Sequence, residues 1–118
     1  MLRSDDSAEE RLHRLCTLNF PRAAGDPRWL LWVELWPRVM HEPALREAQL
    51  EYDEAWHAAI AQVLGEVTDD ADLLAQRMIA LVDGLSVALL TGDPTLTAEQ
   101  AWEHVRALLP AADSASDQ

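Results

Sequence analysis

The apolar residues of this chain recur at steps of three and four, which is the spacing of one face of an α-helix. Two of these stripes are rich in aromatic side chains. The first consists of Trp29, Trp32, Val33, Trp36 and Met40, and the second of Leu45, Tyr52, Trp56, Ala59, Ile60 and Val63. No segment alternates apolar and polar residues as a half-buried strand does. The pattern therefore predicts an all-α fold class.

Helix-capping signals divide the chain into five predicted helices. Ser7 with Glu10, and Thr97 with Gln100, have the capping-box spacing, in which the two side chains satisfy backbone N–H groups of the first turn. Asp26 precedes a proline, which is favoured at the first position of a helix. The predicted helices cover residues 8–18, 27–41, 43–64, 70–91 and 98–109, with Asp69 or Asp70 capping the fourth. These lengths predict a five-helix bundle.

The fourth predicted helix is apolar around most of its circumference, which implies burial on more than one side. Gly84 lies in its middle, where glycine costs about 1 kcal/mol relative to alanine, so we expect a compensating close approach of another helix. Ala88 lies one turn further on, beside Leu81 and Leu85. This face is suited to tight packing, either within the chain or across a dimer axis.

Length and charge limit the possible functions. A chain of 118 residues suits one domain, and we expect residues 1–110 to form it and residues 111–118, which are small and polar, to be a disordered tail. The net charge of −12 repels a phosphate backbone, so we expect no nucleic-acid contact by this chain alone.

The chain has one cysteine, Cys16, so it cannot form an internal disulfide, and this is typical of a reducing cytoplasm. No apolar run approaches the length of a membrane span, and the N-terminus lacks the apolar core of a signal peptide. We expect a cytoplasmic protein with no membrane contact.

Two Glu-x-x-His pairs, Glu10 with His13 and Glu54 with His57, match half of the ligand set of a di-metal carboxylate bundle. At 100° per residue, however, both glutamates fall opposite the apolar stripes of their helices and would point to water. A di-metal enzyme therefore remains a remote alternative, and we predict no catalytic residue, metal or cofactor.

The aromatic stripes are difficult to pack at interior density without leaving a cleft, and Pro37 inside the second helix favours a bend that would leave room beside it. We predict a mostly apolar ligand pocket between the second, third and fourth helices. Its predicted lining is Trp32, Val33, Trp36, Met40, Tyr52, Trp56, Met78 and Val82, with Asp83 as a polar group. The expected ligand is small and hydrophobic or aromatic, and indole faces would also favour a cationic centre.

Several short phrases resemble a known family: WLLWVELW from Trp29, Pro43-Ala44-Leu45, Tyr52 with Trp56, ALVDGL from Ala80, and LTAEQA from Leu96. Together, over residues 8–109, they are similar to the C-terminal regulatory domain of TetR-family repressors of the BetI-like type. The resemblance implies a helical domain that binds a small inducer between its helices and dimerises through its last two long helices. The residues expected at the homodimer interface are Leu74, Leu81, Gly84, Leu85, Ala88, Trp102, Val105 and Leu109.

Members of that family begin with a basic helix-turn-helix domain, and no such segment precedes Ser7. Three explanations for this difference are expected. The chain is a fragment, its start codon was placed too late, or it is a stand-alone domain that acts as a sensor or as a heterodimerising antagonist. The predicted function is the ligand-sensing and dimerisation domain of a TetR-like repressor without its DNA-binding half. The alternative is a helical module used only for protein interaction.

Overall fold

The computed structural model describes residues 7–110 and consists of five helices. They are α1 (Ala8–Asn19), α2 (Pro27–Val39), α3 (Pro43–Leu64), α4 (Ala71–Leu90) and α5 (Ala98–Arg106). Residues 7–110 contain no strand. The predicted all-α fold class is confirmed, and the predicted tail at residues 111–118 lies outside the described residues.

The helices begin where the capping signals place them. The Ser7 and Thr97 side chains accept hydrogen bonds from the backbone N–H groups of Glu10 and Gln100, and both capping boxes are complete. Asp26 caps α2 by accepting from the backbone N–H of Arg28 at 3.0 Å. Asp70 occupies the N-cap position of α4, but its side chain makes no capping hydrogen bond. These caps satisfy backbone donors that have no partner within the helix.

Two helices end two or more residues earlier than predicted. α2 ends at Val39 rather than at residue 41, because the backbone N–H groups of His41 and Glu42 both bond to the Arg38 carbonyl in a turn that leads to Pro43. α5 ends at Arg106 rather than near residue 109. The residues after it form a turn in which the Leu108 N–H bonds to the Val105 carbonyl.

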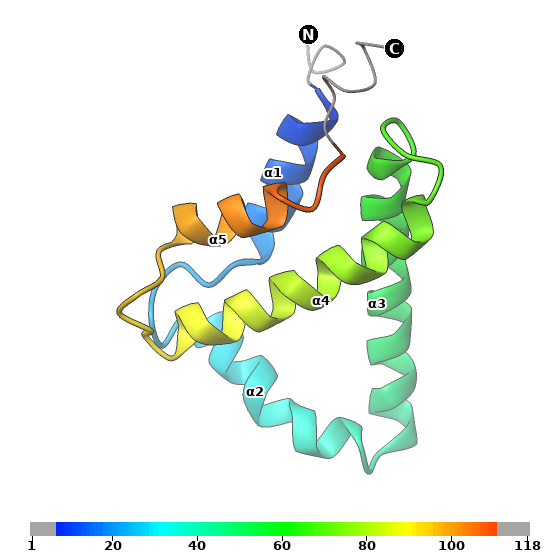
Figure 1. Ribbon diagram of the computed structural model, residues 1–118. Coiled ribbons are helices and arrows are strands. Elements are labelled where there is room, and N and C mark those ends of the chain that lie inside the picture. The colour runs from blue at the N-terminus through cyan, green and yellow to red at the C-terminus, as the bar shows by residue number, and fades with distance from the viewer. Residues whose placement is uncertain (1–6, 111–118) are drawn as a thin grey trace, which may run out of the picture.

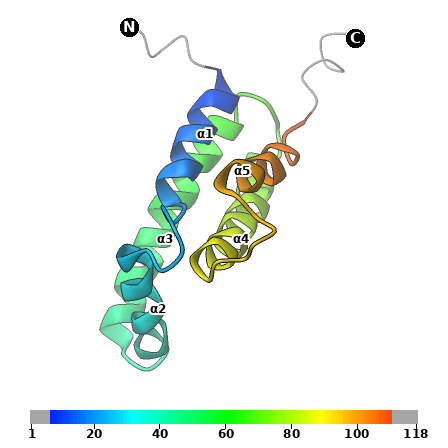
Figure 2. The ribbon, with the colours of Figure 1, turned by 90° about the vertical axis from the view of Figure 1, so that its left-hand side faces the viewer.

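Four of the helices form a packed body, and α2 spans its open side. α3 and α4 pack against each other and diverge from the loop that joins them, while α1 contacts α3, α4 and α5. α5 also packs on α4. α2 runs from the far end of α4 to the far end of α3 (Figure 1) and makes its main contacts with α3. Figure 2 shows the pair α4 and α5 beside the pair α1 and α3.

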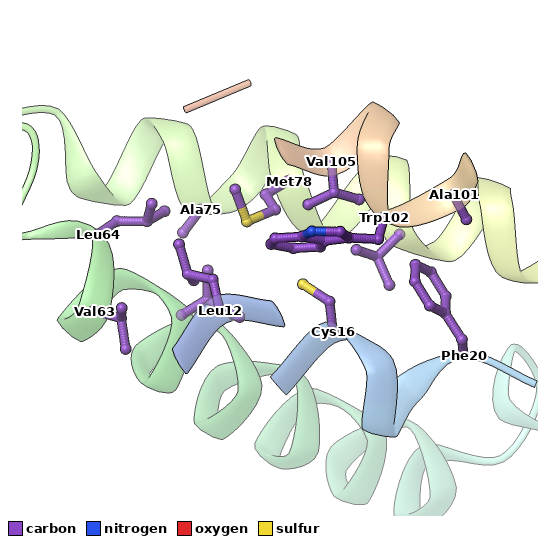
Figure 3. Packing of buried hydrophobic residues seen from close by; sticks show 12 residues of the cluster. Leu12, Cys16, Phe20, Val63, Leu64, Ala75, Met78, Ala101, Trp102 and Val105 are labelled. Carbon is purple, nitrogen blue, oxygen red and sulfur yellow. The ribbon is translucent and has the colours of Figure 1, made fainter. Parts of the chain in front are cut away.

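The core lies between α1, α3, α4 and α5. Figure 3 shows the indole of Trp102 among Cys16, Met78 and Val105. The His13 ring packs edge-on against this indole, with 4.8 Å between the two ring centroids. The buried apolar cluster comprises Leu12, Cys16, Phe20, Ile60, Val63, Leu64, Ala75, Met78, Val82, Ala101, Trp102 and Val105. Burial of these side chains is the main source of stability for the fold.

Candidate functional site

A groove of about 170 Å³ lies between α2, α3 and α4. Five of its lining residues are aromatic, and two are aspartates. The complete lining is Leu18, Asn19, Arg28, Trp29, Trp32, Trp36, Gln49, Tyr52, Asp53, Trp56, Ile79 and Asp83. The groove therefore combines large apolar faces with negative charge.

The first turn of α2 is fixed to the end of α1 by side-chain to backbone hydrogen bonds. The Trp29 indole Nε1 donates to the Asn19 carbonyl at 2.8 Å. The Arg28 guanidinium donates to the Phe20 carbonyl at 3.2 Å and lies 3.6 Å from the Asp26 carboxylate. These contacts hold the first turn of the helix that carries Trp32 and Trp36 to the groove.

The aromatic wall of the groove is partly open to solvent. The rings of Trp32 and Tyr52 lie 5.6 Å apart between centroids and are tilted by 43°, so α2 and α3 meet through an aromatic contact. Trp36 is 40 % exposed and Tyr52 50 % exposed. Large aromatic surfaces left accessible beside a groove are available to a ligand.

The Trp56 indole Nε1 is buried without a hydrogen-bond partner, unlike that of Trp29. An unpaired buried donor costs free energy. Among the described residues the buried Ser86 hydroxyl also lacks a partner.

Two carboxylates give the groove its charge. Asp53 on α3 accepts a hydrogen bond from Gln49 Nε2 at 2.8 Å. Partial burial raises the pKa of the Asp83 carboxyl on α4, and the nearby Asp53 charge raises this pKa further. Arg28 also lines the groove, but its guanidinium is engaged with the Asp26 carboxylate and with backbone carbonyls. A bound cation would relieve the repulsion between the two aspartates.

The structure brings five of the nine predicted ligand residues together in this groove: Trp32, Trp36, Tyr52, Trp56 and Asp83. Met78 and Val82 do not line it, because they face the core and are 0 % and 1 % exposed. Val33 is half-buried outside the groove lining, and the exposed Met40 borders a separate surface depression with Pro43 and Leu50.

Seven lining residues were not predicted: Leu18, Asn19, Arg28, Trp29, Gln49, Asp53 and Ile79. Ile79 and Asp53 could have been found from sequence. Ile79 lies one helical turn before Asp83, and Asp53 is adjacent to Tyr52. Leu18 and Asn19 belong to the last turn of α1 and line the groove because the first turn of α2 packs beside them. Periodicity along one helix does not report such a contact.

The outer face of α4 carries apolar and small residues, with the exposed Arg77 among them, and nothing in the described chain covers it. Leu73 and Val87 are 47 % and 38 % exposed, and Ala80 and Gly84 lie between them on the exposed side. A Cβ built on Gly84 meets no atom within 4 Å. The close helix approach expected at Gly84 therefore does not occur within residues 7–110. We call Leu73, Ala80, Gly84 and Val87 the α4 outer face.

The other predicted interface residues occupy different places. Trp102 and Val105 are buried in the core, which corrects their expected placement at an interface. Leu74, Leu81, Leu85 and Leu109 are half-buried and pack against that core, and Ala88 is also half-buried. By length and composition alone α4 could cross a membrane, and its core face packs against the other helices.

Within residues 7–110, no three His, Cys, Asp or Glu side chains gather as metal ligands. Glu10 is occupied in its capping box, and Glu54 is exposed. His57 instead lies 3.4 Å from the Asp72 carboxylate, in a contact between α3 and α4.

Comparison with known proteins places this fold in a family. The family model described as "BetI-type transcriptional repressor, C-terminal" matches residues 8–113. The proteins named HTH-type transcriptional regulator BetI from Pseudomonas paraeruginosa strain PA7 and Pseudomonas aeruginosa strain LESB58 are each 33 % identical over 93 residues. These alignments cover 75 % of this chain and 47 % of each relative, so the chain spans about half their length.

No solved structure matches the chain. The family model, in contrast, covers nearly the whole sequence, and the structure is all-helical as the TetR-type resemblance implied. The chain belongs to the C-terminal regulatory domain family of BetI-type, TetR-family transcriptional repressors.

Proposed function

We propose that this domain senses a small organic cation, which it binds in the groove between α2, α3 and α4. The observation that carries the proposal is the presence of Asp53 and Asp83 in a groove lined by five aromatic residues. Cations are attracted to the faces of indole and phenol rings, and more strongly when water is excluded. The net charge of −12 also raises the local concentration of cations.

The size of the groove sets the size of the ligand. A cavity of about 150 Å³ accommodates benzene, so a groove of about 170 Å³ fits a compact ligand of a few non-hydrogen atoms. A hydrophobic or aromatic group would contact the indole rings, and the positive charge would lie toward the carboxylates. Without charge, the ligand would leave the repulsion between Asp53 and Asp83 in place.

Titration calorimetry and tryptophan fluorescence with tetramethylammonium test this proposal, with tert-butanol as a neutral probe of similar size. We expect saturable binding of tetramethylammonium and much weaker binding of tert-butanol. Trp36→Ala should weaken binding by roughly 1 to 3 kcal/mol. Leu31→Ala changes a side chain on α2 that is 60 % exposed and outside the groove, so binding should be unchanged. Equal binding of both probes would reject a cation site.

The proposed partner of the α4 outer face is a second copy of the chain. Gly84 supports this, since a glycine in mid-helix is disfavoured and no atom of the described chain explains it. A two-fold axis near Gly84 would let two α4 helices approach closely and cover Leu73 and Val87. Family membership supports the same partner, because TetR-family regulators act as dimers.

Light scattering of the wild-type chain and of Gly84→Leu tests the dimer. A Cβ at position 84 meets no atom within 4 Å among the described residues, and leucine has a higher helix propensity than glycine, so the variant should fold at least as stably as the wild type. We expect a wild-type dimer and a monomeric variant with an unchanged circular dichroism spectrum. A wild-type monomer at tens of micromolar, roughly the concentration at which an interface of standard size would hold, would reject the proposal.

The proposed cellular role is the effector-sensing half of a cytoplasmic transcriptional regulator, without enzymatic activity. The relatives are named as HTH-type regulators, and this chain aligns with about half their length. The 118-residue chain should not bind duplex DNA by itself, because its net charge is −12. Salt-sensitive binding of duplex DNA by this chain in a gel shift would contradict that.

A module used only for protein interaction is the alternative function that the exposed α4 outer face favours.

A further inference from the structure

The groove and the α4 outer face meet on one helix. Asp83 lines the groove, and the next residue, Gly84, lies on the exposed side. Val87 follows Asp83 by four residues and Gly84 by three, so its side chain neighbours both positions on the helix surface. Val87 therefore forms the border between the groove and the α4 outer face.

A second copy bound to Gly84 and Val87 would bring the negatively charged grooves of both chains close to one dimer interface. Each groove contributes Asp53 and Asp83, and each chain carries a net charge of −12. Like charges brought together on association oppose it, and a bound cation in each groove reduces that repulsion. The same carboxylates, gathered by dimerisation, attract a cation more strongly than those of one chain.

We infer that cation binding in the groove and dimerisation through the α4 outer face strengthen each other. This inference rests on the proposed function for both the groove and the dimer. The coupling is reciprocal, because a ligand that tightens the dimer must also bind the dimer more tightly than the monomer. Val87 and Gly84 form the dimer interface, and Asp83 supplies the negative charge through which a bound cation changes the strength of dimerisation.

Sedimentation velocity measures the coupling as the dimer dissociation constant with and without saturating tetramethylammonium chloride. Sodium chloride of equal ionic strength is the reference, because salt alone screens the repulsion. We expect tetramethylammonium to lower the dissociation constant by about fivefold or more, the lower end of the usual range for coupled sites. In the reverse direction, each chain of the dimer holds one cation, so monomeric Gly84→Leu should bind tetramethylammonium more weakly by the square root of that factor, about twofold for a fivefold shift.

Two variants with the same change in net charge separate a local effect from a general one. Asp83→Asn should tighten the dimer without ligand and remove most of the shift caused by tetramethylammonium. Glu54→Gln removes a charge from an exposed position on α3 outside the groove, so it should keep the full shift.

The failures of the three ideas are distinguishable. Absence of tetramethylammonium binding rejects the groove as a cation site, and a wild-type monomer rejects the dimer. Binding and dimerisation that occur with an unchanged dissociation constant reject the coupling alone. An equal shift in Asp83→Asn and wild type would also overturn it.

Discussion

The indole Nε1 of Trp29 donates a hydrogen bond to the backbone carbonyl of Asn19, with 2.8 Å between nitrogen and oxygen. The bond joins the first turn of α2 to the last residue of α1, across the loop between them. Beyond this turn, α2 has its main contacts with α3. The bond therefore helps to set where the aromatic side chains of α2 stand above the groove.

Loss of this bond should destabilise the fold. In Trp29→Phe the ring remains apolar, but the Asn19 carbonyl loses its donor, so we expect unfolding to become easier by about 1 to 2 kcal/mol. Chemical denaturation monitored by circular dichroism measures this change in the free energy of unfolding. Trp36→Phe is the matched control, since this indole is 40 % exposed and the change should stay within about 0.5 kcal/mol. Equal effects of the two substitutions would mean that the bond contributes nothing.

The two methionines that sequence assigned to the ligand pocket should behave differently. Met78 is fully buried, so Met78→Ala should lower the free energy of unfolding by about 2 to 5 kcal/mol through lost contacts and a cavity. Met40 is 68 % exposed, and Met40→Ala should change the free energy of unfolding by less than about 0.5 kcal/mol. Urea denaturation of both variants compares them. A mild effect at Met78 would contradict its place in the core.

The capping box of α5 should be needed for the stability of that helix. Thr97→Ala removes the acceptor for the Gln100 N–H, and we expect a loss of about 0.5 to 2 kcal/mol. Thermal denaturation measures the loss. Thr17→Ala, on an exposed position inside α1, should be neutral or slightly stabilising because alanine has the higher helix propensity. The capping role fails if both substitutions have the same effect.

Cation binding should weaken as the pH falls. Burial and the Asp53 charge raise the pKa of Asp83 above its ordinary value of 3.8, so this carboxylate takes up a proton at a higher pH than a free aspartate. The protonated group no longer attracts a cation, and affinity for tetramethylammonium should decline as the pH falls through the raised pKa. Calorimetry from pH 7.5 downward, as far as the fold persists, follows the decline. In Asp83→Asn this part of the pH dependence should disappear.

Asp83 should also cost stability at neutral pH. A carboxyl whose pKa is raised in the folded state binds its proton more tightly there than in the unfolded chain, so its charged form opposes folding. Asp83→Asn should therefore raise Tm at pH 7, and the advantage should vanish below the unfolded pKa, where both states are protonated. Asp69→Asn, on an exposed loop position, serves as control. A lower Tm for Asp83→Asn would show that the carboxylate stabilises the fold.

The helices could be predicted closely because capping is local chemistry. Ser7, Asp26 and Thr97 each bond to a backbone N–H within three residues, so tertiary contacts do not decide where those helices begin. The ends were less predictable. α2 and α5 finish in turns whose geometry depends on the residues that follow, such as Pro43.

The groove could be predicted only in part. Periodicity shows which residues form the apolar stripe of a helix, but it does not show which other helix each of these residues contacts. On α4, Met78 and Ile79 are successive residues about 100° apart, and both are apolar. The structure turns Met78 to the core and Ile79 to the groove. For the same reason Trp102 was assigned to an interface, although α5 directs its apolar stripe into the core.

Cys16 makes opening of the core measurable with a thiol-labelling reagent, without any change to the sequence. It is the one cysteine of the sequence, it is fully buried, and burial raises the pKa of its thiol to about 12. Only the thiolate attacks a labelling reagent, so modification of the native domain must wait for the core around Trp102 to open. The labelling rate under native conditions therefore reports the frequency of that opening. A ligand or partner that stabilises the closed domain should slow this chemistry in proportion to its occupancy.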